Sequence, residues 1–198
     1  MTETGSGAAP GPDGLLRCPW ALSAQEYLAY HDEEWGRPVH DDTVMFERLC
    51  LEAFQSGLSW LTILRKRDSF RAAFHGFEPA VVAAFGPEDV ARLLADVGIV
   101  RNRAKIEAAI HNAAAAVALP EGLAAVVWKY ADDRANPPEG PLFMADVPAS
   151  TPASKALSRE LRSRGFSFTG PVTAYATLQA SGAVNDHLRD CFRRAAYS

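Results

Sequence analysis

Apolar residues recur every three or four positions along most of this chain, whereas sustained alternation of apolar and polar residues is rare. The first spacing places apolar side chains on one face of an α-helix, and alternation would be typical of a half-buried strand. Three stripes stand out: Met45, Leu49 and Ala53; Val90, Leu93, Leu94 and Val97; and Ile106, Ala109, Ile110 and Ala113. We therefore predict an all-α fold, with Gly98 ending the second of these helices.

The length of the chain favours one domain. With 198 residues, of which 48% are hydrophobic, it can bury one sizeable core. Residues 1–16 lack the basic start and apolar stretch of a signal peptide, and we expect them to form a disordered leader. Residues 136–141, rich in Pro and Gly, are the strongest interior break, but the parts on either side are too small for separate cores. Residues 17–198 are therefore expected to form a single domain.

The composition indicates in which cellular compartment the protein is expected and which kinds of partner it can bind. No apolar run approaches the roughly 18 residues that a membrane span needs. Three widely spaced cysteines without an export signal favour thiols or metal ligands over disulfides and predict a cytoplasmic protein. The formal net charge of −4 argues mildly against a nucleic-acid partner, although a local basic patch is sufficient for phosphate binding.

Four side chains of metal-ligating type lie near the two ends of the chain. Twelve residues separate Cys18 from His31, and His187 and Cys191 are four positions apart. We expect the second pair to share one face of a helix. Two thiolates and two imidazoles can complete a closed tetrahedral zinc site, which would join the ends and leave no position for a reacting water. The alternative is that these side chains serve packing and hydrogen bonding alone.

Glu52 is an acidic residue on the apolar side of its predicted helix, near Met45 and Leu49 on a helical wheel. A carboxylate there needs partners, water or a shifted pKa, which makes it a candidate functional group. The surrounding sequence supplies four large aromatic residues, Trp20, Tyr30, Trp35 and Trp60. Aromatic rings can stack on an extruded purine while a buried acceptor binds its amino edge. A structural glutamate beside an ordinary aromatic core is the alternative.

Residues 151–182 are predicted to form two helices joined by a tight turn. The exposed side of the first helix carries three basic residues, Lys155, Arg159 and Arg162. The turn contains Gly165 and Gly170, and Pro171 suits the first position of the second helix. Glycines allow the backbone to approach a phosphate, which the free N–H groups of a helix start can bind. An ordinary helical hairpin with a solvated basic face is the alternative.

Six stretches are distributed along the chain from Arg17 to Cys191: RCPW, YLAYHDEEWG, MFERLCLEAFQSGLSW, GIVRNRAKIEAAIHNA, SKALSRELRSRGFSFTG and ASGAVNDHLRDC. In this order they resemble the DNA-3-methyladenine glycosylase I family, a branch of the helix-hairpin-helix DNA glycosylases. The resemblance implies a helical bundle of that type, with its hairpin at about 151–182. It also implies one structural zinc ion, held by Cys18, His31, His187 and Cys191.

The resemblance assigns a base pocket as well. Glu52 would be the catalytic residue, accepting hydrogen bonds from the edge of the base. Tyr30 and Trp60 would enclose the extruded base between them, with Trp20 and Trp35 close by. Ala176 replaces a serine that the family carries beside this pocket.

The activity and the partner also follow from the resemblance. The protein would be a monomeric, monofunctional glycosylase that flips 3-methyladenine out of double-stranded alkylated DNA and hydrolyses its N-glycosidic bond. Gly57 and Leu58 match a turn that enters the DNA where the base has left, and Gly165 and Gly170 would bind the DNA backbone. Bifunctional relatives use a nucleophilic lysine in the second hairpin helix, and this chain has no lysine after position 155.

Related glycosylases carry an aspartate after the hairpin. In this sequence Asn185 aligns with it, and Asp186 is the alternative. Two other functions stay open: a non-catalytic, zinc-containing protein that recognises damaged DNA, and a glycosylase for another lesion such as 3-methylguanine. Release of bases from alkylated DNA separates these functions.

Overall fold

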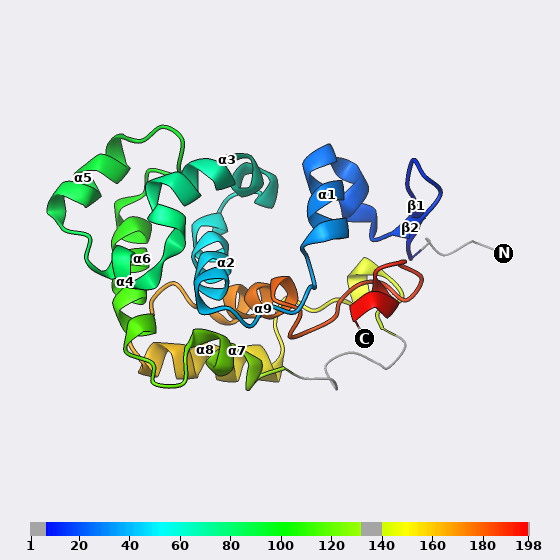
Figure 1. Cartoon of the computed structure of the whole chain (residues 1–198). Helices are drawn as coiled ribbons and strands as arrows, with labels where there is room; N and C mark the ends of the chain where they lie inside the picture. Colours follow the sequence, from blue (N-terminus) through cyan, green and yellow to red (C-terminus); the bar gives the residue numbers. More distant parts are fainter. Residues whose placement is uncertain (1–6, 132–139, 198) are drawn as a thin grey trace.

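The computed structural model of the protein describes residues 7–131 and 140–197, which are mostly helical (Figure 1). The α-helices are α1 (Gln25–Glu33), α2 (Asp42–Gln55), α3 (Trp60–Ala73), α4 (Pro79–Ala83), α5 (Pro87–Ala95), α6 (Arg103–Val117), α7 (Leu123–Trp128), α8 (Pro152–Ser163) and α9 (Pro171–Ala180). The 3-10 helices are η1 (Pro19–Ser23), η2 (His75–Phe77), η3 (Met144–Asp146) and η4 (Arg194–Tyr197). Strands β1 (Ala9–Pro10) and β2 (Leu16–Arg17) pair antiparallel. The predicted helical fold is confirmed, with this short strand pair added to it.

Most of the longer helices begin at a short polar residue or a proline. The side chains of Asp41, Ser59, Asn102 and Thr151 each accept a hydrogen bond from the backbone N–H three residues on. Each of these bonds satisfies one otherwise free donor at a helix start. Prolines open α4, α5, α8 and α9, where the missing N–H removes no helical bond. The caps and prolines thus fix where these helices begin.

Helix α2 lies at the centre of the helical part, packed against α3, α6, α7 and α9 (Figure 1). Helix α8 packs along α9, and α4 packs along α6. The buried apolar side chains between Val39 and Val184 form one core cluster, to which α2 contributes Met45, Phe46 and Leu49. This arrangement holds the C-terminal end of α2, including Glu52, inside the fold.

The two ends of the chain meet beside α1, at one side of the helical part (Figure 1). The backbone N–H of Phe192 donates to the carbonyl of Leu16 at 2.9 Å. A second, small apolar cluster of Cys18, Leu188 and Cys191 is buried between the two segments. The ends are therefore in direct contact, as the predicted metal site requires.

The expected disordered leader is largely ordered. Residues 7–16 include β1 and the start of β2, and residues 1–6 lie outside the described part of the chain. The buried Arg17 guanidinium pairs with Asp13 at 2.6 Å and with Asp32 at 2.7 Å, which ties this segment to α1. The prediction is wrong for residues 7–16, because the partner on α1 lies fifteen residues away from Arg17 and local composition does not reveal it.

Helix α5 ends at Ala95, earlier than predicted. Val97 is exposed, and the Asp96 carboxylate accepts the N–H of Gly98 at 2.7 Å, so Gly98 does not cap the helix. The predicted break at 136–141 lies mostly outside the described residues. In the described ranges, no helix combines the length and apolar character needed to cross a membrane.

Candidate functional site

A cavity of about 300 Å³ opens between α1, α2, α3 and α9, a size in the range of small-molecule sites. Its lining residues are Trp20, Tyr27, Tyr30, Trp35, Glu52, Gln55, Trp60, Met144, Ala176 and Gln179. All five residues expected to form the base pocket, namely Glu52, Tyr30, Trp60, Trp20 and Trp35, are among them. Segments that lie far apart in the sequence thus build one mostly aromatic wall around one carboxylate.

Glu52 lies near the end of α2 and is only 7% exposed. Burial raises the pKa of its carboxyl to about 8, and the nearby Arg48 guanidinium opposes this shift only in part. Within the described residues, no hydrogen bond to this carboxylate stabilises its charged form. A buried acceptor that the protein leaves unpaired is available to a ligand in the cavity.

Tyr30 and Trp60 touch each other across the aromatic wall. Their ring centroids are 5.4 Å apart, and the ring planes are inclined by 51°. This separation is typical of two rings in direct contact. A base enclosed between Tyr30 and Trp60, as the sequence resemblance implies, therefore requires the rings to separate. Burial and the neighbouring Glu52 raise the pKa of Tyr30 above its ordinary range, so its phenol stays neutral.

The turn between α2 and α3 is adjacent in the sequence to residues of both helices that line this cavity. Gly57 has φ of +82°, a conformation that favours glycine, and Leu58 is exposed. The buried Lys105 on α6 donates to the carbonyls of Phe54 at 2.9 Å and Ser56 at 2.6 Å. The lysine satisfies carbonyls at the end of α2 and favourably opposes the negative end of its dipole, and so fixes where the turn begins.

The four predicted metal ligands come together at the junction of the two chain ends. Their ligand atoms all lie within 4.8 Å of one another, and all four residues are buried. The Sγ of Cys191 is 3.4 Å from Nε2 of His31 and 3.5 Å from Nδ1 of His187, and Sγ of Cys18 is 3.8 Å from the same Nδ1. Zinc–ligand bonds at tetrahedral angles give sulfur–nitrogen edges of about 3.5 Å. The donor set and its spacing therefore fit a metal ion.

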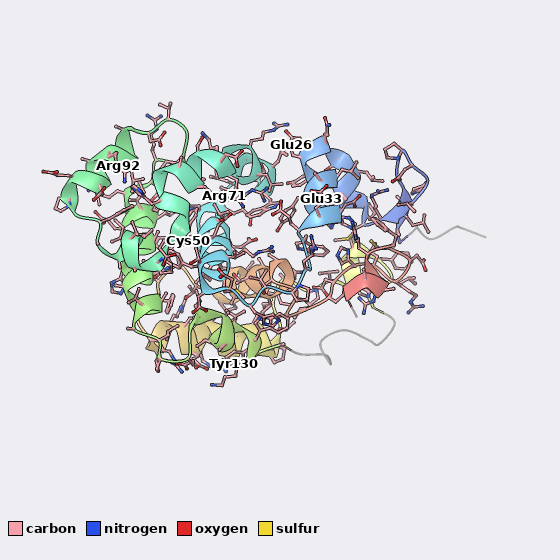
Figure 2. All side chains as sticks on the ribbon, viewed as in Figure 1. Glu26, Glu33, Cys50, Arg71, Arg92 and Tyr130 are labelled. Carbon is pink, nitrogen blue, oxygen red and sulfur yellow. The ribbon has the colours of Figure 1, made fainter. Side chains whose placement is uncertain are left out.

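Both imidazoles of this group are oriented by a second hydrogen bond. Nδ1 of His31 lies 2.8 Å from the Asp32 carboxylate, and Nε2 of His187 lies 3.2 Å from the Trp35 carbonyl. Metal-bound histidines commonly make such bonds, which fix the ring nitrogen that faces the metal. Cys50, the third cysteine, is buried on α2 within the helical part, away from this group (Figure 2).

The prediction that a helix carries His187 and Cys191 is wrong, although the two side chains are in contact as expected. Residues 185–193 are not helical. Instead, the N–H of Cys191 donates to the carbonyl of Leu188 in a turn, and the N–H of Leu188 donates to Sγ of Cys18 at 3.4 Å. Contacts with the other end of the chain shape this segment, and the four-residue spacing alone cannot reveal them.

The predicted hairpin is formed by α8, α9 and the turn between them. Lys155, Arg159 and Arg162 are exposed on α8, as expected. Gly165 has φ of +94°, and Gly170 is the residue before Pro171 at the start of α9. The Asn112 side chain accepts the N–H of Ser167 at 2.8 Å and donates to its carbonyl at 2.9 Å. Asn112 on α6 thus fixes the backbone conformation of the turn.

An unpredicted feature of this turn is Phe168, which is exposed and has φ of +57°. A positive φ is uncommon for a bulky residue, and such strain is concentrated at functional sites.

Comparison with known proteins decides the family. The methyladenine glycosylase family matches residues 20–194. This chain belongs to that family. It is 44% identical over 180 residues to DNA-3-methyladenine glycosylase 1 of Escherichia coli strain K12, covering 89% of this chain and 96% of the relative.

Two solved structures of the family support the same assignment. A crystal structure of 3-methyladenine DNA glycosylase I superposes with a TM-score of 0.84 at 45% identity, covering 89% of this chain and 98% of that one. The Staphylococcus aureus enzyme, solved to explain its recognition of 3-methyladenine, gives a TM-score of 0.83 at 33% identity over 90% of this chain and 96% of that one.

Asn185 and Asp186 are the two candidates for the aspartate that related glycosylases carry after the hairpin. Neither of them lines the cavity. The Asn185 amide donates to the Arg194 carbonyl at 3.0 Å. Asp186 is buried, and its carboxylate accepts hydrogen bonds from Tyr175 and Gln179.

Four lining residues escaped the sequence analysis: Tyr27, Gln55, Met144 and Gln179. Gln179 follows Ala176 by three positions on α9, so a helical wheel centred on Ala176 could have found it. Tyr27 could have been found in the same way, three residues before Tyr30. Met144 follows the interior break, and no local pattern places it near the cavity.

Proposed function

We propose that this protein is a DNA glycosylase that hydrolyses the N-glycosidic bond of 3-methyladenine in double-stranded alkylated DNA. The observation that carries the proposal is the unpaired, buried Glu52 carboxylate in a cavity with aromatic walls. An extruded base can stack on such walls, and its amino group needs an acceptor. Membership in the methyladenine glycosylase family supports the same substrate.

Release of this base requires only limited catalytic assistance from the protein. Methylation at N3 makes the attached base cationic, so it leaves as a neutral molecule when water adds to C1′ of the sugar. The Glu52 carboxylate would accept a hydrogen bond from the amino group of the base. Its negative charge would also favour the cationic substrate and the positive charge that develops on the sugar. The substrate's own charge weakens the bond, so less acid–base help is needed than for an unmodified base.

The DNA surface would combine the α2–α3 turn with the α8–α9 hairpin. Leu58, exposed after Gly57, would fill the space left by the base. The first N–H groups of α9, after Gly170, would bind a backbone phosphate, helped by the basic side of α8. Gly170, just before α9, and Gln179, which lines the cavity from α9, are about 14 Å apart along the helix at the usual rise per residue. One rigid helix would thus link the phosphate site and the base site.

We infer that Cys18, His31, His187 and Cys191 hold one zinc ion. Four protein ligands close a tetrahedron, so zinc there would stabilise the junction of the chain ends and take no part in hydrolysis. We further propose that the protein acts as a monomer in the cytoplasm.

The proposed reaction is tested by incubating the protein with methylated DNA and separating the released bases by chromatography. We expect free 3-methyladenine as the main product. Binding to alkylated DNA without release of any base would favour the non-catalytic alternative. Release of 3-methylguanine in preference to 3-methyladenine would reassign the lesion.

The proposed phosphate site gives a second prediction. Gly170→Ala should weaken binding to DNA that carries an abasic-site analogue by about tenfold, because a methyl group would separate the backbone from the phosphate. Gly170 has φ of −64°, and the nearest atom to an added Cβ is 3.9 Å away, so the fold tolerates alanine. Gly165 is a poor test, since alanine at its positive φ would be strained.

Gly86→Ala is the matched control for this measurement. Gly86 also precedes a proline at a helix start, and an added Cβ there meets no other atom within 4 Å. Fluorescence anisotropy at fixed salt should show unchanged affinity for Gly86→Ala. Equal affinities for both variants would remove the N-terminus of α9 from the DNA surface.

A further inference from the structure

Among the described residues that line the cavity, Gln179 is the one whose side chain is held by a buried carboxylate. Its Nε2 donates to Oδ2 of Asp186 at 2.6 Å. The Tyr175 hydroxyl donates to the same oxygen, also at 2.6 Å, from one turn earlier on α9. Asp186 is 1% exposed and does not itself line the cavity.

This contact determines how the Gln179 amide is turned. A carboxylate accepts hydrogen bonds and cannot donate them, so the amide nitrogen must face Asp186. The amide oxygen is then the atom left over for a ligand. Burying a carboxylate is costly. The Arg194 guanidinium interacts with Asp186 electrostatically, but Oδ1 of Asp186 has no hydrogen-bond partner among the described residues.

We propose that Gln179 is a specificity-determining residue whose amide oxygen accepts a hydrogen bond from the amino group of the extruded adenine, with Asp186 as its positioning residue. The proposal rests on the proposed glycosylase function. An adenine amino group has two N–H donors, and Glu52 and Gln179 supply two acceptors on the walls of one cavity. Guanine carries a carbonyl oxygen at the corresponding position, which two acceptors repel.

Three variants test this assignment. Gln179→Leu removes the acceptor at nearly constant volume. Gln179→Glu keeps an acceptor but loses the donor to Asp186, so repulsion between the two carboxylates should move it. Asp186→Asn removes the charge that holds the amide. The matched control is Ser181→Ala, which removes a buried hydrogen bond to the Thr177 carbonyl near the end of α9 without touching the cavity.

The main readout is the ratio of 3-methyladenine to 3-methylguanine released from methylated DNA by the full-length protein. We expect Gln179→Leu to lower the ratio about threefold to tenfold, and to weaken binding of free 3-methyladenine by a similar factor. Gln179→Glu and Asp186→Asn should lower the ratio in the same direction. Ser181→Ala should lower only the melting temperature. Metal content is measured for every variant, since Asp186 adjoins His187 in the chain.

A wild-type ratio in Gln179→Leu would overturn the specificity role. A lowered ratio in Gln179→Leu together with a wild-type ratio in Gln179→Glu would overturn the positioning role of Asp186, even if Asp186→Asn fails to fold. A lowered ratio in Ser181→Ala would attribute the effect to disturbance of α9 and would overturn both roles. Failure of the wild-type protein to release any base would instead overturn the proposed function.

Discussion

Replacing Glu52 with glutamine is expected to give a folded protein that releases 3-methyladenine roughly tenfold to a hundredfold more slowly than the wild type. The substitution keeps the size but removes the charge and replaces one acceptor oxygen with a donor. A hydrogen bond to a charged group contributes about 1.5–3 kcal/mol, and a loss of 1.4 kcal/mol in the transition state slows a reaction about tenfold. The affinity for free 3-methyladenine should fall as well.

The same residue should give the reaction its pH dependence. The buried Glu52 has a pKa of about 8, so the carboxylate becomes the main form only above that pH. If the ionised form is the active one, kcat/KM should rise up to tenfold per pH unit below 8 and become constant above it. Glu52→Gln should remove this dependence. Single-turnover release measured from pH 6 to pH 9 tests both statements.

Stability should respond to the substitution in the opposite direction. Because burial raises the pKa of Glu52 in the folded state, the folded protein favours the neutral carboxyl. The contribution of Glu52 to the free energy of unfolding is therefore highest below pH 4.5, the ordinary pKa, and decreases as the pH rises towards 8. Glutamine has no charge to bury, so Glu52→Gln should melt at a higher temperature than the wild type above pH 8. The difference should disappear in acid.

Glu47→Gln is the matched control for these measurements. Glu47 lies on the same helix, but its carboxylate pairs with Arg71 at 2.8 Å and does not line the cavity. We expect it to lose some stability at neutral pH while keeping the wild-type rate of release. A Glu52→Gln protein with wild-type release, wild-type affinity for the base and no gain in stability would show that Glu52 is structural.

Local patterns were sufficient to predict that Glu52 lies on the buried face of its helix and that Pro171 is the first residue of α9. The apolar face of α2 is set by the periodicity of a helix, so a carboxylate on that face is visible in the sequence. Caps and prolines act within one turn, and Pro171 could therefore be placed correctly. Four aromatic residues of the cavity, Trp20, Tyr30, Trp35 and Trp60, were assigned to a base pocket through family resemblance, because aromatic content alone cannot distinguish a pocket from a core.

Contacts between distant segments could not be predicted. The carboxylate–amide pair of Asp186 and Gln179 depends on how the chain returns after α9, and no spacing rule encodes that path. The ordered segment before Arg17 depends on Asp32 in α1. The turn that carries Cys191 depends on Cys18 at the other end of the chain. In each case the partner is contributed by tertiary structure, which overrides local propensity.

Loss of the metal is expected to have the largest effect on stability. Cys191→Ala removes one of four ligands, and elemental analysis should find less than stoichiometric zinc, whereas the wild type should contain one zinc per chain. Metal binding contributes folding free energy directly, about 10–16 kcal/mol for small zinc domains that have little other core. This protein has a separate helical core, so we expect the loss to concentrate in residues 16–35 and 185–194. Hydrogen exchange should become fast there first.

Cys50→Ala is the control that isolates the metal from the loss of a buried sulfur. Cys50 is 1% exposed on α2 and is not part of the metal-binding group. Removing its sulfur leaves a small cavity, which should lower the free energy of unfolding by about 1 kcal/mol without changing the zinc content. Cys191→Ala should melt at a clearly lower temperature than Cys50→Ala. Equal melting temperatures and one zinc per chain in both variants would contradict the proposed ligand set.

The four metal-ligand residues also adjoin the cavity. Their position predicts how strongly Cys191→Ala affects binding of the base. Trp35 lies 4.6 Å from the His187 ring and Trp20 lies 5.2 Å from the His31 ring, and both tryptophans line the cavity. Glu52 and Trp60 are instead held by α2 and α3. We therefore expect Cys191→Ala, assayed below its melting temperature, to bind free 3-methyladenine with a smaller loss of affinity than Glu52→Gln shows. A larger loss would mean that the zinc-held aromatic residues contribute more to base binding than the carboxylate does.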